Sequence, residues 1–294
     1  MTQIYKSVDG ERAVQERYRA FLRYWPAANQ QLHVPTREGE TFIVACGDPN
    51  APPVLLLHGS GGNAAMWMGD VAAWAAHYRV YAVDVIGEPG LSAPSRPPLA
   101  SEAYGLWLDD VLRTLSLDRV SIVGISLGGR LALDYAMRRP DRGESLALLC
   151  PGGIGRQIFG EIVFPPASSD FPPAIRKFLE FVTLIFENFH PRMEELPIFS
   201  DDALTSLTMP VLAIVGGQDE LLDSAGTRQR LELHVPHAEV HYLPDAGHLL
   251  RGQTARILQF LLRVKKEREL ERCSPAARSQ GISCEGSSAS DSWR

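Results

Sequence analysis

The stretch RVSIVGISLGGRLALDYAMRR, Arg119–Arg139, carries an apolar segment, a glycine-rich turn and a helix-like segment in direct succession. The residues before the turn are mostly β-branched or aliphatic, which predicts a buried strand, and the residues after it predict an amphipathic helix. Between them stands GISLG, residues 124–128, the Gly-x-Ser-x-Gly pattern of a nucleophile elbow. This context predicts that Ser126 is a nucleophile at the junction of a strand and a helix.

The turn itself gives mechanical reasons for this assignment. The nucleophile of such an elbow has a strained backbone, and Gly124 and Gly128 lack the side chains that would collide across the turn. The helix that begins beside Ser126 directs free N–H groups and its positive dipole end toward developing negative charge. Ser126 is therefore placed to carry an oxyanionic intermediate; the alternative interpretation is an ordinary polar residue in a strand-to-helix turn.

A second Gly-Ile-Ser occurs near the end of the chain, in SQGISCEGSS, residues 279–288. There Ser283 is followed by Cys284 and Glu285, so the second glycine of the pattern is missing, and no apolar strand precedes it. Context therefore selects Ser126 over Ser283.

The rest of the chain repeats the alternation of strand-like and helix-like segments. Besides the strand before Ser126, short apolar runs occupy residues 41–46, 53–58, 78–85, 145–150, 210–216 and 238–243. Helical spacing of apolar residues is found at 63–77, 101–115, 127–139, 224–234 and 252–270. Strands that are apolar on both faces and alternate with helices predict the α/β class, with a mostly parallel, doubly wound sheet.

Breaks in this alternation predict the domain organisation. No strand is expected between Pro151 and Met209, where the sequence is helical and apolar, and the composition from about Arg272 onward predicts disorder. The expected parts are an N-terminal helical extension (1–30), a core (31–150 and 209–265), an inserted helical cap (151–208) and a C-terminal tail (266–294).

Composition limits the possible partners. The 294 residues carry a formal net charge of -6, which disfavours nucleic acids and anionic membranes because little positive charge is left to neutralise phosphates. Charges interrupt the first two dozen residues, so we expect neither a secretory signal nor membrane insertion, and cytoplasmic residence follows. The four cysteines have no CxxC spacing, and His234, His237 and His241 do not share a helix face, so no disulfide and no metal site is expected. The oligomeric state is not indicated.

A serine hydroxyl needs a base, and histidine titrates in the useful range. His248 lies in LPDAGHLLRG, in a turn between the last strand-like run and the last helix. Asp219 follows a buried strand directly and precedes His248 by 29 residues, so it can orient the imidazole. Asp223 is a local rival, whereas Asp84 is expected to brace the loop that follows it.

The apolar run LLLHGSGG leads into a glycine-rich turn at residues 58–62. Backbone N–H groups in such a turn can stabilise an oxyanion, together with the N–H of the residue after the nucleophile, Leu127. We favour the Ser60 N–H, with Gly61 as the neighbouring candidate. Phosphate binding is disfavoured because the turn has neither G-x-G-x-x-G spacing nor a Lys-Ser/Thr pair.

Five motifs in this order, LLLHGSGGNAAMW, YAVDVIGEPGLS, GISLGG, GGQDELL and PDAGHLL, resemble the α/β-hydrolase superfamily, specifically bacterial serine carboxylesterase-like members with a short helical cap. The resemblance covers about residues 30 to 265. It implies Ser126 as nucleophile, His248 as general base and acid, and Asp219 as the orienting acid. It further implies an oxyanion hole of the Ser60 and Leu127 amides, a small ester or acyl substrate, and no cofactor.

Several branches of this superfamily fit less well. Dehalogenases and epoxide hydrolases carry an aspartate at the elbow, and carbon–carbon bond hydrolases usually carry an aromatic residue where Leu249 stands. Perhydrolase, lactonase or lyase chemistry and a non-catalytic binding protein stay open as alternatives. The apolar side chains of the cap suggest either an apolar acyl or aromatic ester pocket or only internal packing: Phe171, Phe178, Phe181, Leu184, Ile185, Phe186 and Phe189.

Overall fold

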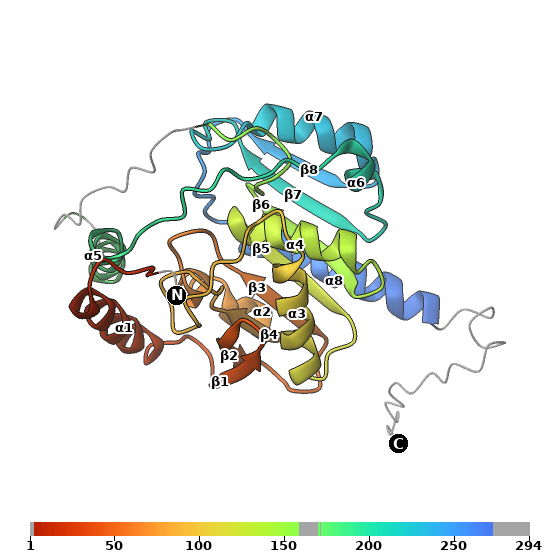
Figure 1. Ribbon diagram of the computed structural model, residues 1–294. Helices are drawn as coiled ribbons and strands as arrows, with labels where there is room; N and C mark the ends of the chain where they lie inside the picture. Colours follow the sequence, from red (N-terminus) through yellow and green to blue (C-terminus); the bar gives the residue numbers. More distant parts are fainter. Residues whose placement is uncertain (1–2, 159–169, 171, 273–294) are drawn as a thin grey trace, which may run out of the picture.

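The computed structural model describes residues 3–158, 170 and 172–272, and its centre is one eight-stranded sheet (Figure 1). The strand order is β1-β2-β4-β3-β5-β6-β7-β8. The neighbouring strands from β4 to β8 pair in parallel, whereas β1 pairs with β2, and β2 with β4, in antiparallel orientation. This sheet confirms the predicted α/β class. The strands are β1 (Asn29–Thr36), β2 (Gly39–Cys46), β3 (Pro53–Leu57), β4 (Arg79–Val83), β5 (Val120–Ile125), β6 (Gly143–Leu149), β7 (Val211–Gly216) and β8 (Glu239–Leu243).

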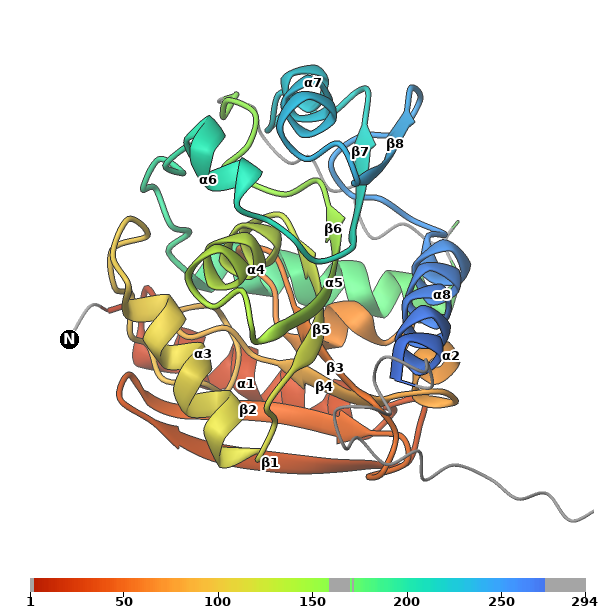
Figure 2. The same cartoon turned by 90° about the vertical axis from the view of Figure 1, so that its right-hand side faces the viewer.

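Helices cover both faces of the sheet, which divides the core into two layers (Figure 2). Side chains alternate across a strand, so Leu55 and Leu57 of β3 belong to one layer, and Val54 and Leu56 to the other. The first layer packs under α3 (Ala103–Thr114), α4 (Leu127–Arg138) and α7 (Ser224–His234), and the second under α1 (Val8–Leu22), α2 (Val71–Ala75) and α8 (Thr254–Arg272). No helix within the described ranges is both long and apolar enough to cross a bilayer.

Two elements differ from the sequence prediction. Strand β1 was not predicted, because it is an edge strand with mostly polar, exposed residues, and its pairing with β2 defines it. The helix predicted over 63–77 is divided into a 3-10 turn, η1 (Ala64–Trp67), and the short helix α2. Asn63 caps η1, and the exposed Gly69 lies between the two pieces, where a continuous helix is costly.

The predicted cap segment, 151–208, is distributed over two places. Helix α5 (Pro173–Asn188) packs on α1, so the N-terminal extension supports it. Helix α6 (Asp201–Thr205) instead packs on α7 of the core, where the Arg230 guanidinium pairs with Asp201 at 2.5 Å. Of these two helices, α5 therefore packs on the N-terminal extension, whereas α6 belongs to the body of the fold. Phe171 lies outside the described residues.

The C-terminal boundary also needs correction, because α8 continues through Arg272. Residues 266–272, assigned to the tail by sequence, are helical. They are rich in good helix formers, and Arg268 anchors them to the body by an ion pair with Glu144 at 3.0 Å. Residues 273–294, including Ser283, lie outside the described residues.

Candidate active site

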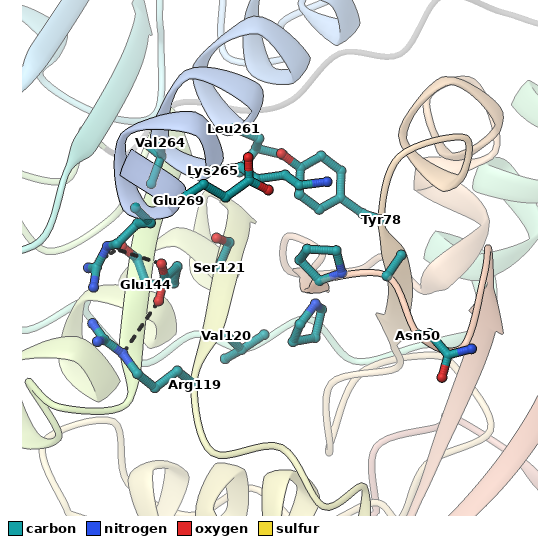
Figure 3. Close-up of a pocket in the computed structure, with 14 residues that line it drawn as sticks. Asn50, Tyr78, Arg119, Val120, Ser121, Glu144, Leu261, Val264, Lys265 and Glu269 are labelled. Atoms are coloured by element: carbon teal, nitrogen blue, oxygen red, sulfur yellow. Dashed lines mark hydrogen bonds and ion pairs between the residues drawn. The ribbon is translucent and has the colours of Figure 1, made fainter. Parts of the chain in front are cut away.

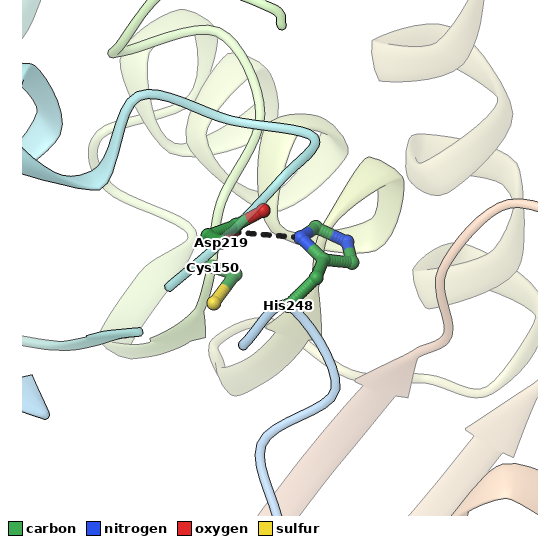
Figure 4. A group of neighbouring side chains, drawn as sticks. All are labelled: Cys150, Asp219 and His248. Carbon is green, nitrogen blue, oxygen red and sulfur yellow. Dashed lines mark hydrogen bonds and ion pairs between the residues drawn. The ribbon is translucent and has the colours of Figure 1, made fainter. Parts of the chain in front are cut away.

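The structure brings Ser126, His248 and Asp219 together at the carboxyl ends of the parallel strands. The Ser126 Oγ lies 3.0 Å from His248 Nε2, and His248 Nδ1 lies 2.8 Å from Asp219 Oδ2. Figure 4 shows the second of these hydrogen bonds, with the aspartate and the histidine on loops that follow different strands. Each ring nitrogen of the imidazole thus faces one partner, as proton transfer from serine to histidine requires.

The turn between β5 and α4 holds Ser126 in a strained conformation, with φ 53° and ψ -113°. A Cβ at Gly128 would meet the Leu57 carbonyl oxygen at 2.0 Å, and a Cβ at Gly124 would meet the Gly128 oxygen at 2.6 Å. The two glycines are therefore sterically required. The Ser126 N–H donates to Leu149 at 2.9 Å, which fixes the strained residue to the neighbouring strand.

The Asp219 carboxylate is well supplied with hydrogen-bond donors. Oδ1 accepts the N–H groups of Leu221 and Leu222 at 2.8 and 3.0 Å, and Oδ2 faces His248. Burial opposes ionisation, but the His248 hydrogen bond and charge and the two amides outweigh it, so the pKa of Asp219 is lowered. The rival Asp223 instead accepts the Gly226 N–H at 2.8 Å and caps α7.

Cys150 is a neighbour of this pair that sequence reasoning did not single out. Its sulfur and one ligand atom each of Asp219 and His248 lie within 4.8 Å of one another (Figure 4). Burial, with the adjacent Asp219 charge, raises the pKa of the thiol. This trio is the one potential metal-binding group found among the described residues, but Asp219 and His248 are already hydrogen-bonded to each other, so a metal would compete with that bond.

The glycine-rich turn after β3 lies against the elbow, since a Cβ at Gly59 would be 3.4 Å from the Ser126 Cβ. The Gly61 N–H donates to the Glu88 carboxylate at 2.6 Å and so is not free to bind an oxyanion. The geometry therefore disfavours the Gly61 alternative and favours Ser60. Leu127 is the first residue of α4, so its N–H has no carbonyl partner within the helix.

The loop that follows β4 braces this turn. The Asp84 carboxylate accepts the N–H groups of Ala64 and Leu91 and the Tyr18 hydroxyl, each at 2.8 Å. The brace predicted for Asp84 is therefore present, and α1 contributes to it. His58 accepts the Val85 N–H at 2.9 Å through Nε2, and burial lowers its pKa to about 4, so this histidine is neutral.

The comparison with known families agrees with this architecture. A family model described as alpha/beta hydrolase fold matches residues 52–190. That range includes the turn after β3 and the whole strand–elbow–helix unit around Ser126.

The chain belongs to the α/β-hydrolase superfamily.

Relatives of this α/β-hydrolase include two proteins of Bacillus subtilis (strain 168). The uncharacterized carboxylesterase nap is 29% identical over 79% of this chain and 85% of its own length. The carboxylesterase YbfK is 27% identical over 83% of this chain and 92% of its own length. Among solved structures, naproxen esterase (carboxylesterase NP) from Bacillus subtilis superposes with a TM-score of 0.72 at 26% identity, covering 87% of this chain and 99% of that one. The chain is thus carboxylesterase-like by distant homology.

A cavity of about 420 Å³ opens beside this candidate site, with Ser60, Ser126 and His248 in its wall. Much of the remaining wall is apolar and comes from η1, α2 and α5. Polar residues also line the cavity. Among them is Asp70, whose carboxylate accepts a hydrogen bond from the Thr254 hydroxyl and whose pKa is raised by burial.

The apolar residues of the predicted cap are divided between the wall of this cavity and internal packing. Four of them, Phe178, Phe181, Ile185 and Phe186, line the cavity. Phe189 instead packs edge-to-face against Tyr5, with ring centroids 6.0 Å apart, and Leu184 packs against the core layer beneath. Helix α5 is therefore both the roof of the cavity and a packing element.

A second cavity, of about 320 Å³, lies at the amino ends of the parallel strands, away from the elbow (Figure 3). Its charged groups largely pair with one another: Glu144 binds Arg119 at 3.4 Å and Arg268 at 3.0 Å. Ser121 accepts a hydrogen bond from the buried Ser145 hydroxyl at 2.9 Å and faces no histidine here. Among the described residues that line this cavity, no nucleophile is paired with a base.

Proposed function

We propose that this α/β-hydrolase is a serine carboxylesterase that works through an acyl-enzyme intermediate. The observation that carries the proposal is the continuous hydrogen-bonded series from the Ser126 hydroxyl through His248 to Asp219, with distances of 3.0 and 2.8 Å. A serine in this arrangement can transfer its proton to the imidazole as it attacks a carbonyl carbon.

The proposed reaction has two halves. In the first, Ser126 attacks the ester, His248 takes the serine proton and gives it to the departing alcohol, and Asp219 stabilises the imidazolium. In the second, His248 activates a water molecule that hydrolyses the acyl-enzyme. The Ser60 and Leu127 N–H groups stabilise the negative oxygen in both halves, and the positive end of α4 adds to this effect.

The lining of the cavity favours substrates that are esters with an apolar acyl or aromatic group. Its apolar wall includes two phenylalanines of α5, Phe178 and Phe186, that can contact a ring or an alkyl chain. The related solved structure is named as a naproxen esterase, which fits an aromatic acid as the acyl group. A panel of p-nitrophenyl esters with short, long and aromatic acyl chains tests this: equal kcat/KM across the panel would contradict it.

Labelling with a fluorophosphonate probe tests the chemistry itself. The wild type should be labelled and should show a burst with p-nitrophenyl acetate, and Ser126→Ala should lose both. Ser283→Ala, which alters the other Gly-Ile-Ser, is the matched control and should react like the wild type.

Other outcomes would point to the alternatives. An unlabelled wild type would rule out an activated serine. Labelling without turnover of any ester would favour a binding protein, whereas turnover that requires hydrogen peroxide or a lactone would favour perhydrolase or lactonase chemistry on the same three residues.

A further inference from the structure

Glu88, in the loop after β4, is a buried carboxylate that the proposed reaction does not use. It is 1% exposed, and its Oε2 accepts the Gly61 N–H at 2.6 Å and faces the Ser60 hydroxyl at 3.4 Å. Its other oxygen, Oε1, is buried and accepts no hydrogen bond from the described residues. Burying a carboxylate with one oxygen that lacks a hydrogen bond lowers the stability of the folded protein, which points to a functional role for Glu88.

The contact with Gly61 fixes the turn that carries the candidate oxyanion donor. Gly61 has φ +71°, a left-handed conformation that favours glycine, and a Cβ there would meet the Phe186 ring at 3.1 Å. The turn is therefore held between Glu88 on one side and α5 on the other. Because the Gly61 N–H is directed to Glu88, the preceding peptide, which bears the Ser60 N–H, has a restricted orientation.

The charges around Glu88 favour its ionised form. Two guanidinium groups, Arg96 and Arg192, act on it electrostatically and oppose the effect of burial. Arg96 is held by the Gly87 and His190 carbonyls at 2.8 and 2.7 Å. Arg192 is held by Tyr104 and Glu194 at 2.5 and 2.6 Å.

Other ionisable groups also face this carboxylate. The remaining hydroxyls within electrostatic reach are Tyr5, before α1, and Tyr104, on α3, and burial raises the pKa of both. Burial also raises the pKa of Glu88, to about 7, while the Gly61 N–H and the two arginines lower it. Protonation of Glu88 therefore falls within the working range of a histidine base.

We infer that Glu88 is a positioning residue of the oxyanion hole, whose ionised carboxylate holds the Gly61 N–H and so keeps the Ser60 N–H directed at the reacting carbonyl. This inference rests on the proposed esterase function. The charged acceptor matters because a hydrogen bond to a carboxylate is stronger than one to a neutral oxygen. A proton on Oε1 would also lack an acceptor among the described residues.

Two substitutions at Glu88 test the inference. Glu88→Ala removes the acceptor, and kcat for p-nitrophenyl acetate at pH 8.5 should fall about 100-fold while KM changes less than about threefold. The inhibition constant of a trifluoromethyl ketone, which mimics the oxyanion, should rise by a similar factor. Glu88→Gln keeps a neutral acceptor, so its kcat at this pH should stay within about tenfold of the wild type.

The pH profile separates positioning from a merely structural role. On the acidic limb, log kcat/KM of the wild type should rise more steeply with pH near pH 7 than log kcat/KM of Glu88→Gln, because Glu88 loses a proton there and glutamine has none to lose. Asp134→Asn is the matched control, since Asp134 is also a buried carboxylate but pairs with Arg138 at 2.9 Å and not with the turn after β3, and its profile should match the wild type.

The outcomes are distinguishable. An active wild type with a kcat unchanged in Glu88→Ala, or a Glu88→Gln slope equal to that of the wild type, would overturn the inference alone. A wild type that neither labels nor turns over esters would overturn the proposed function and this inference with it. Should Glu88→Ala fail to fold, as judged by circular dichroism, the slope of Glu88→Gln decides.

Discussion

Asp219 and Glu88 are two buried carboxylates of the candidate site, one beside His248 and the other beside Gly61, and their pKa values are shifted in opposite directions. Asp219 faces three donors, one imidazole and two amides, and its pKa is lowered. Glu88 has one short hydrogen bond from an amide, one long contact with a hydroxyl and one open oxygen, and its pKa is raised to about 7. Burial raises the pKa of both carboxylates, and Glu88 is the more deeply buried; the donors around Asp219 outweigh the effect of burial, whereas those around Glu88 do not.

The difference also separates two roles. In the proposed reaction, Asp219 acts on a side chain, because it orients His248 and stabilises its charged form. Glu88 acts on the backbone, because it fixes the peptide next to the oxyanion donor. The role of Asp219 requires a carboxylate that is ionised near neutral pH. Glu88, in contrast, can gain or lose a proton near neutral pH.

The largest effect is expected on the Asp219 side. Asp219→Asn should lower kcat about 10⁴-fold, because an amide in this place favours the wrong imidazole tautomer and cannot stabilise the imidazolium. Steady-state kinetics with p-nitrophenyl acetate measure this loss. Asp223→Asn is the control, because asparagine still caps a helix, and its kcat should be close to that of the wild type. Similar losses in both variants would remove the distinction between the two aspartates.

A smaller effect is expected on stability: the contributions of Glu88 and Asp219 to folding stability should change with pH in opposite directions. The pKa of Glu88 is higher in the folded state than its ordinary value of 4.5, so its contribution to stability is full below about pH 4.5 and is lost as pH rises through about 7. The pKa of Asp219 is lowered, so its contribution is present above its ordinary value of 3.8 and is lost at lower pH.

The melting temperature measures this contrast. From pH 5 to pH 8, the Tm of Glu88→Gln relative to the wild type should rise by up to about 5 °C, which corresponds to about 3 kcal/mol. Asp219→Asn should be less stable than the wild type at pH 7, and the gap should narrow as pH falls toward 4. A constant difference between Glu88→Gln and the wild type across this range would show that Glu88 does not titrate there.

The smallest effect is expected on stability at the contact between α1 and Asp84, which braces the turn after β3. Tyr18→Phe removes the hydroxyl that donates to Asp84 at 2.8 Å and should lower the free energy of unfolding by about 2 kcal/mol, since the acceptor is a buried carboxylate. Urea denaturation measures this. Tyr24→Phe, at an exposed position just after α1, should change stability by less than about 0.5 kcal/mol. Equal values for the two variants would mean that α1 does not support this side of the site.

Much of the site was predictable because its signals are local in sequence. The elbow is encoded by a strand, two glycines and a helix within 21 residues, and steric conflict at Gly124 and Gly128 shows why those residue types are needed. Asp219 and His248 each follow a recognisable strand, and the carboxyl ends of parallel strands meet at one edge. The sequence therefore located the three side chains that the structure brings together.

The tertiary structure alone decided what those residues touch. It directs the Gly61 N–H to Glu88, 27 residues away, and so leaves Ser60 as the candidate donor. It also places Cys150 beside Asp219, and it divides the predicted cap between a roof helix on α1 and a segment on α7. These outcomes depend on hydrogen-bond directions and packing between segments far apart in the chain, whereas periodicity and motifs report only what a short segment prefers by itself.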